Sequence, residues 1–237
     1  GETSRIVRLA TRDHGVQSAI AKGASRPRSR FGAGLQVLSA GQAHLLLSER
    51  HDLHTLTAFD LTNLPVRLTA DVGRYATATA AAEVVLRVAP AEPHPEAYDV
   101  LLEALQQLEV VPLAELPAVS IRALWRLVGA LGFAPALDAC ARDGRPLPES
   151  GDVAFSAPDG GALCTLCARE SETTMLPAAA REALGQLSSG VGGLPDLDAR
   201  HAAAHRRLVA RYIRFHMAEG AALPALEFWL GQGWVAA

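Results

Sequence analysis

The first sixty residues alternate apolar and polar side chains over short runs. Five runs have the period of two that is expected of β-strands: 5 to 10, 16 to 21, 35 to 39, 42 to 48 and 53 to 59. Turn-forming residues such as Asp13, Gly15 and Gly41 separate these runs. Five short strands are what a small closed barrel of the oligonucleotide-binding (OB) type requires. The pattern therefore predicts an OB-fold over residues 1–66, although other small all-β units share it.

From about residue 68 the apolar positions take the period of an α-helix. Proline and glycine divide this pattern into five predicted helices: 74 to 88, 96 to 108, 118 to 131, 177 to 187 and 195 to 218. Residues 135 to 171 are predicted to form a long loop. Loops of this length are uncommon in a compact protein unless they have a function. The predicted fold class is α+β, in which the barrel is followed by a helical domain at residues 67–237 with an insert at about 138–172.

Composition indicates a globular chain whose two parts differ in charge. The 237 residues are 49% hydrophobic and 20% charged, with a net charge of -3. Residues 1 to 80 carry ten Lys/Arg against six Asp/Glu, and the rest carry twelve against nineteen. We therefore expect an anionic partner for the first part. No apolar run approaches the roughly 20 residues of a membrane span, and no leader is visible, which predicts a cytoplasmic protein without membrane association.

Residues 18 to 34 gather cations without any carboxylate. These cations are Lys22, Arg26, Arg28 and Arg30. Because the flanking runs predict strands, we expect the cations on a long loop, where a nucleic-acid backbone would relieve their mutual repulsion. Three further cations on the first strand would extend this DNA-binding surface: Arg5, Arg8 and Arg12. The alternatives are a solvated loop, or a non-catalytic adaptor whose loop docks an acidic protein.

The last predicted helix carries a second basic strip. Its arginines lie within about 60° of one another at 100° per residue: Arg200, Arg207, Arg211 and Arg214. We expect Arg207, Arg211 and Arg214 to contact DNA, and the alternative is a solvated face near a helix C-terminus. His201 and His205 on this helix are spaced i,i+4, which suits either a metal or ordinary packing.

The long loop contains three cysteines in a pattern typical of zinc sites. Cys140 and Asp143 form one knuckle, and Cys164 and Cys167 form a C-x-x-C twenty residues later. Since a carboxylate is an acceptable zinc ligand, these four residues predict a structural zinc site. The alternative is a degenerate zinc finger that binds no metal and is stabilised by its own packing.

Enzymatic activity is not predicted. His94-Pro95-Glu96 with the C-x-x-C imitates a zinc deaminase, but Leu163 replaces the required proline and Cys140 is left without a role. The chain contains no P-loop, nucleophile elbow or dinucleotide-binding glycine motif.

Two segments are specific enough together to indicate a family. They read Ala21-Lys22-Gly23-Ala24-Ser25-Arg26-Pro27-Arg28-Ser29-Arg30-Phe31 and Leu131-Gly132-Phe133-Ala134-Pro135-Ala136-Leu137-Asp138-Ala139-Cys140. With Arg5-Ile6-Val7-Arg8-Leu9, Gly73-Arg74-Tyr75 and Tyr212-Ile213-Arg214-Phe215-His216, they resemble the RecO family of DNA repair proteins. The likeness covers essentially the whole chain. Asp143 stands where many relatives place a metal-binding cysteine.

This resemblance implies an OB-fold, a helical domain and a zinc-finger-like insert. It also implies binding of single- and double-stranded DNA, annealing of complementary strands, and work with RecR in loading the RecA recombinase. A further implied partner is the acidic, apolar-tipped tail of single-stranded DNA-binding protein (SSB). Such a tail needs an apolar pocket rimmed by guanidinium groups, and the predicted helix 118 to 131 offers Arg122, Trp125 and Arg126 for it.

Overall fold

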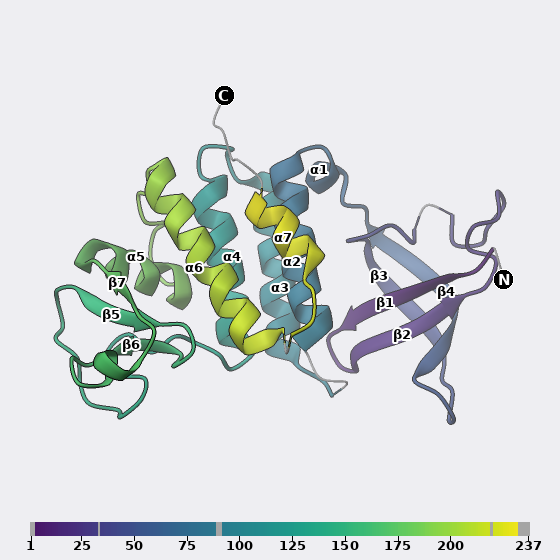
Figure 1. Ribbon diagram of the computed structural model, residues 1–237. Coiled ribbons are helices and arrows are strands. Elements are labelled where there is room, and N and C mark those ends of the chain that lie inside the picture. The colour runs from purple at the N-terminus through teal and green to yellow at the C-terminus, as the bar shows by residue number, and fades with distance from the viewer. Residues whose placement is uncertain (1–2, 33, 89–91, 219, 232–237) are drawn as a thin grey trace.

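A computed structural model describes residues 3–32, 34–88, 92–218 and 220–231 of the chain. A sheet lies at one end of the molecule, helices fill the middle, and a small cysteine-containing insert lies at the other end (Figure 1). The order of elements, strands first and helices afterwards, confirms the predicted α+β class.

The N-terminal sheet has four strands in the order β1-β2-β4-β3. Their bounds are β1 Arg5–Thr11, β2 Gly15–Ala21, β3 Ala40–Leu46 and β4 Leu53–Asn63. β1 pairs antiparallel with β2, β2 pairs parallel with β4, and β3 pairs antiparallel with β4. Because β1 and β3 are both edges of this sheet, the described strands do not close the predicted barrel.

The prediction of a strand at residues 35 to 39 is wrong. This segment forms turns, with Ser39 donating a backbone hydrogen bond to Gln36 at 3.2 Å and Leu38 in the left-handed region at φ 69°. A left-handed residue breaks the extended backbone that a sheet ladder needs. Leu38 packs against the buried cluster of the helical region that includes Leu108 and Leu116, so its apolar side chain belongs to a different core from that of the sheet.

The helices form a bundle around α2. The larger helices are α2 Val72–Val88, α3 Pro95–Val110, α4 Leu116–Ala130, α5 Ala178–Ser189, α6 Ala199–Met217 and α7 Pro224–Gly231. A short helix, α1 Val66–Thr69, precedes them. α2 packs against α1, α3, α4, α6 and α7, and its small residues Ala76, Ala80 and Ala81 are fully buried. Alanine has no long side chain, which lets several helices approach α2 closely.

The sequence pattern missed α7. Leu226 and Trp229 are completely buried, and the Glu83 carboxylate of α2 accepts hydrogen bonds from the backbone N–H groups of Ala225 and Leu226 at 3.0 Å each. A carboxylate at these positions satisfies donors that a helix N-terminus leaves unpaired. α7 is thus held by a residue more than 140 positions away.

The predicted loop at 135 to 171 contains two strands of a small sheet, and the third strand follows the loop directly. The order of this sheet is β6-β5-β7, with β5 Val153–Ser156, β6 Gly161–Leu163 and β7 Thr174–Leu176, and a 3-10 turn, η1, spans Cys167–Glu170. Phe155 belongs to the same buried cluster as Trp125 and Tyr212 of the helices. Tyr212 donates a hydrogen bond to the carbonyl of Gly160 at 3.2 Å, and the insert is therefore packed firmly on α6.

Candidate metal centre and nucleic-acid interface

The first cysteine knuckle is built by a tight turn. Cys140 donates a backbone hydrogen bond to Arg145 at 2.7 Å, and Gly144 donates one to Cys140 at 2.9 Å. Gly144 has φ 73°, a conformation that glycine adopts at little cost. The turn directs Asp143 back toward Cys140.

The second knuckle begins where β6 ends. Cys164 follows β6 directly, and Ala168 donates a backbone hydrogen bond to the Cys164 carbonyl at 2.9 Å. Ala136 exchanges backbone hydrogen bonds with Gly160 and Ala162, at 3.0 and 2.8 Å, on the other side of β6. This pairing brings the first knuckle beside the second.

The four predicted ligands converge. The ligand atoms of Cys140, Asp143, Cys164 and Cys167 all lie within 4.8 Å of one another. The thiols of Cys164 and Cys167 donate to the Asp143 carboxylate at 3.6 and 3.5 Å. Ligand atoms about 2.0 to 2.3 Å from a tetrahedral zinc ion are separated from each other by roughly 3.5 to 4 Å. The cluster therefore offers donor atoms of the types that bind metal ions, close enough together for one ion to be held among them.

The electrostatics of the cluster favour a cation. Desolvation, together with hydrogen bonding among the neighbouring sulfurs and Asp143, raises the pKa of Cys167 to about 12. The backbone N–H of Arg145 and the neighbouring thiols hold the pKa of Asp143 below its usual value. The ionised carboxylate of Asp143 makes ionisation of the neighbouring Cys167 thiol unfavourable, because a second negative charge would lie beside the first. A bound divalent ion would instead favour the thiolate.

Arg142 ties the two knuckles together. Its guanidinium forms an ion pair with Asp159 at 2.9 Å and donates a hydrogen bond to Ser171 beyond the second knuckle. The sequence places Arg142 beside Cys140 but carries no signal for these distant partners. A positive charge next to the cluster also moderates the repulsion among its anionic ligands.

The basic loop projects from the sheet as a series of turns. Arg26, Ser29 and Gly32 each donate a backbone hydrogen bond three residues back, at 3.1, 3.0 and 3.1 Å. The ring of Phe31 is only 5% exposed and packs with the buried residues of the sheet, Ala19, Ala21 and Leu56. The loop is consequently anchored at its C-terminal end.

The cations of this loop are available to a ligand. All four are exposed, and none of them forms an ion pair within the residues that the structure describes: Lys22, Arg26, Arg28 and Arg30. The Arg30 guanidinium lies 5.0 Å from the centroid of the Phe31 ring. Arg5 donates a hydrogen bond to the Ser25 hydroxyl at 3.2 Å, which places the start of β1 beside the loop. Arg8 on β1 is also exposed.

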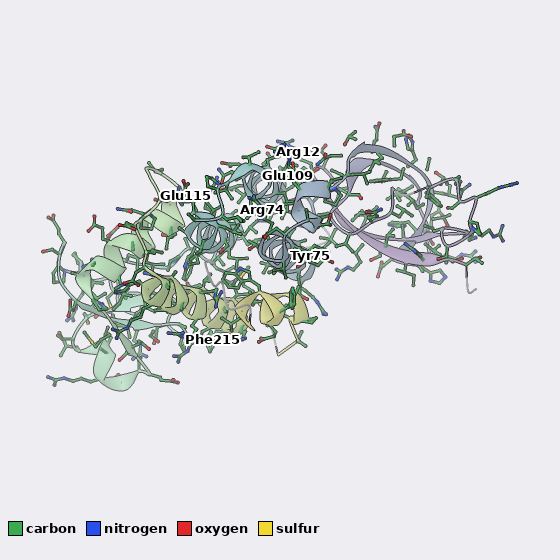
Figure 2. All side chains as sticks on the ribbon, turned by 90° about the horizontal axis from the view of Figure 1, so that it is seen from above. Arg12, Arg74, Tyr75, Glu109, Glu115 and Phe215 are labelled. Atoms are coloured by element: carbon green, nitrogen blue, oxygen red, sulfur yellow. The ribbon has the colours of Figure 1, made fainter. Side chains whose placement is uncertain are left out.

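Three other predicted DNA contacts already have intramolecular partners. Arg12 lies where the sheet meets the helices (Figure 2), and its guanidinium donates two hydrogen bonds to Asp99 of α3 at 2.9 Å each. On α6, Arg211 pairs with Glu172 at 2.7 Å and Arg214 pairs with Glu227 at 2.6 Å. Arg207 of the same strip is exposed. DNA would have to compete with these carboxylates.

The predicted partner surface on α4 differs from an open pocket. Trp125 is completely buried, with its ring centroid 5.1 Å from that of Tyr212. Arg122 donates hydrogen bonds to the carbonyls of Gly192 and Gly193, and Arg126 pairs with Glu103 at 2.8 Å. The two guanidinium groups thus hold neighbouring segments in place. A role in binding a partner stays a prediction for these residues.

The histidines do not join the cysteine cluster. His201 donates its backbone N–H to Asp198, the N-cap of α6, at 2.8 Å, and its ring lies 2.9 Å from the same carboxylate. His205 is 3% exposed, and burial lowers its pKa. His94 begins α3, away from the cluster that the cysteines form.

A β-sheet with an anchored basic loop is joined to helices that carry an insert with a potential metal-binding cluster, and this arrangement defines an α+β protein with two candidate binding sites. Two family models divide the chain, the N-terminal model of recombination protein O over residues 1–65 and the C-terminal model over residues 69–222. The chain belongs to the RecO family of DNA repair proteins.

Curated relatives agree with this assignment. A protein of Anaeromyxobacter dehalogenans strain 2CP-C, named DNA repair protein RecO, is 39% identical over 197 residues, which are 82% of this chain and 75% of the relative. The protein of the same name from Anaeromyxobacter sp. strain K is 38% identical over the same shares. Among the described helices, none combines the length and apolar character that crossing a bilayer demands.

Proposed function

We propose that this RecO-family chain is a recombination mediator that binds single- and double-stranded DNA without turnover. The basic loop of Lys22, Arg26, Arg28 and Arg30 carries the proposal, because its exposed cations lack carboxylate partners among the described residues and Phe31 fixes their position. Binding through phosphate charge is indifferent to sequence, which suits a protein that must act on any broken chromosome. Arg5, Arg8 and Arg207 would extend the contact.

Annealing follows from the same property. A protein that neutralises the backbones of two strands lowers their mutual repulsion and raises their local concentration. Together with RecR, such a protein would load RecA onto DNA that SSB covers, at the bacterial nucleoid. The family membership supports this role.

The decisive test measures how binding of a single-stranded oligonucleotide depends on salt. Each phosphate contact contributes about 0.7 to 0.9 to the slope of log K against log salt, so reversing Arg26, Arg28 and Arg30 to Glu should flatten the slope by about two to three. Reversing the exposed Arg67, Arg87 and Arg169 changes net charge equally and should leave most of the slope. Equal slopes in the two triple variants would remove the loop from the site and favour an adaptor that docks acidic proteins.

We propose zinc as the ion of the cysteine cluster, held by Cys140, Asp143, Cys164 and Cys167. The set offers three thiolates and one carboxylate, which closes a tetrahedral site and leaves no position for catalysis. Elemental analysis of protein purified without chelator should find about one zinc per chain, and a Cys164→Ser, Cys167→Ser variant should lose it. Folded wild-type protein without zinc would contradict the proposal.

The SSB tail is proposed to dock on the helical region. A cavity of about 520 Å³ is lined by apolar residues that include Ala218, Leu223 and Pro224, and also by Arg214 and its ion-pair partner Glu227, which the tail's carboxylates would have to displace. This combination suits an apolar tip followed by carboxylates, whereas Trp125 is buried between helices. A fluorescent tail peptide should therefore lose affinity with Arg214→Ala. A larger loss with Arg122→Ala, Arg126→Ala would return the site to α4.

A further inference from the structure

The two oxygens of the Asp143 carboxylate have different partners. Oδ2 accepts hydrogen bonds from the thiols of Cys164 and Cys167, at 3.6 and 3.5 Å. Oδ1 instead accepts one from the backbone N–H of Arg145 at 3.1 Å. The carboxylate is therefore turned so that one oxygen faces the sulfurs while the other is held by the chain two residues further on. A carboxylate held in this way offers a metal ion a single, directed oxygen.

Arg145 contacts this carboxylate a second time through its side chain. The guanidinium Nε lies 3.4 Å from Oδ2, the oxygen that faces the sulfurs. The carbonyl of Arg145 in turn accepts the backbone N–H of Cys140 at 2.7 Å. One residue thus holds both members of the first knuckle, Cys140 through the backbone and Asp143 through the backbone and the side chain.

The charge of the Arg145 guanidinium is directed at the cluster. Three thiolates and one carboxylate carry four negative charges, of which a divalent ion balances two. The neighbouring Arg142 is engaged by other carboxylates, Asp159 at 2.9 Å and Glu170 at 3.5 Å. Among the described residues, Asp143 is the one carboxylate at ion-pair distance from Arg145. Arg145 therefore offsets part of the ligand charge.

A carboxylate ligand needs such support more than a thiolate does. A thiolate binds through one sulfur, whereas a carboxylate has two equivalent oxygens and rotates unless neighbouring groups fix it. The Asp143 side chain is also 28% exposed, so water competes for its oxygens. The contacts of Arg145 therefore matter because position 143 holds aspartate.

We propose that Arg145 is a positioning residue of the metal site. It directs Oδ2 of Asp143 toward the three thiols and offsets part of their charge. This inference rests on the proposed zinc site, and it adds that the affinity of this site depends on the Arg145 side chain only while position 143 carries a carboxylate.

The test measures the zinc affinity of the full chain by competition with a chromophoric chelator under reducing conditions. Groups that orient metal ligands typically contribute about 10- to 100-fold in affinity. The Arg145 side chain is 64% exposed, and its backbone N–H remains in any variant except proline. We therefore expect Arg145→Ala to weaken zinc binding about tenfold, at the lower end of that range.

Arg169→Ala is the matched control. Arg169 lies two residues after Cys167, as Arg145 lies two residues after Asp143, and it is exposed. It forms no ion pair within the described part of the chain. This variant removes the same charge from the insert and should change zinc affinity less than twofold. Equal affinities of the Arg145→Ala and Arg169→Ala proteins would overturn the proposal.

A second background separates positioning from a general effect on the fold. In Asp143→Cys protein a sulfur ligand replaces the carboxylate, so adding Arg145→Ala should change zinc affinity less than twofold. The charge-transfer absorption of cobalt(II)-loaded protein grows with the number of thiolates, and it should be stronger in Asp143→Cys than in wild type. A tenfold loss in both backgrounds would overturn the positioning role while leaving the zinc site in place. Failure of wild-type protein to bind either metal would overturn the zinc site itself, and the role of Arg145 with it.

Discussion

Phe31 is the residue that anchors the basic loop to the folded sheet. Truncating its side chain should change the position of the loop while leaving the charge of the loop unchanged. The side chain is 5% exposed and belongs to a small core whose other buried hydrophobic residues, among those that the structure describes, are Ala19, Ala21 and Leu56. A buried Phe removes about 150 to 250 Å² from water, which at about 25 cal/mol per Å² corresponds to roughly 4 to 6 kcal/mol as an upper bound. Measured Phe→Ala substitutions in cores cost about 3 to 5 kcal/mol.

We expect Phe31→Ala to lie at the lower end of that range, about 3 kcal/mol, because the sheet is open beside its core and can relax. The loop cations should then lose their fixed positions while their number stays the same. DNA affinity should fall, but the slope of log K against log salt should change by less than about one, unlike the effect of charge reversal.

The assay combines urea denaturation, which gives the free energy of unfolding of the sheet, with oligonucleotide titrations at several salt concentrations. Phe31→Leu is the matched control, since a large apolar residue retains most of the packing and should cost less than about 1.5 kcal/mol. A Phe31→Ala protein within 1 kcal/mol of wild type and with unchanged DNA affinity would refute the anchoring role.

Two further predictions concern the helical bundle. His205 is buried, and its pKa is lowered first by burial and second by the charge of His201, so the folded protein favours the neutral imidazole. As pH falls below about 6.5, the unfolded chain binds a proton at this residue more readily than the folded chain does, and the free energy of unfolding should decrease. His205→Leu should remove this part of the pH dependence, and identical stability curves of the two proteins between pH 7 and 5 would contradict it. Glu83→Ala should weaken the N-terminus of α7 by about 0.5 to 2 kcal/mol, because two backbone donors lose their acceptor. Faster hydrogen exchange in α7, with little change in α5, is the measurement, and equal exchange in α7 of wild type and variant would speak against the cap.

Local pattern determined most of the helical part of this protein. Pro95 and the apolar stripe after it predicted α3, and the structure begins that helix at Pro95. Apolar periodicity predicted α4 and α6 in the same way, because each of these helices has one apolar face that must be buried, whichever element covers it. The spacing of the cysteines likewise identified the four members of the cluster, because a knuckle is a local turn.

Tertiary structure decided the remainder. Residues 35 to 39 alternate apolar and polar side chains as a strand does. In the folded protein, however, Leu38 packs against the core of the helices, and the backbone turns at that residue. α7 has too few residues for a periodic signal, and its start depends on Glu83 from α2. The partners of Arg12, Arg211 and Arg214 are carboxylates 13 to 87 residues away, which no local pattern contains. Periodicity reports which face of a segment is apolar, whereas the element that covers that face, and the charge that meets each arginine, are set only when distant segments pack together.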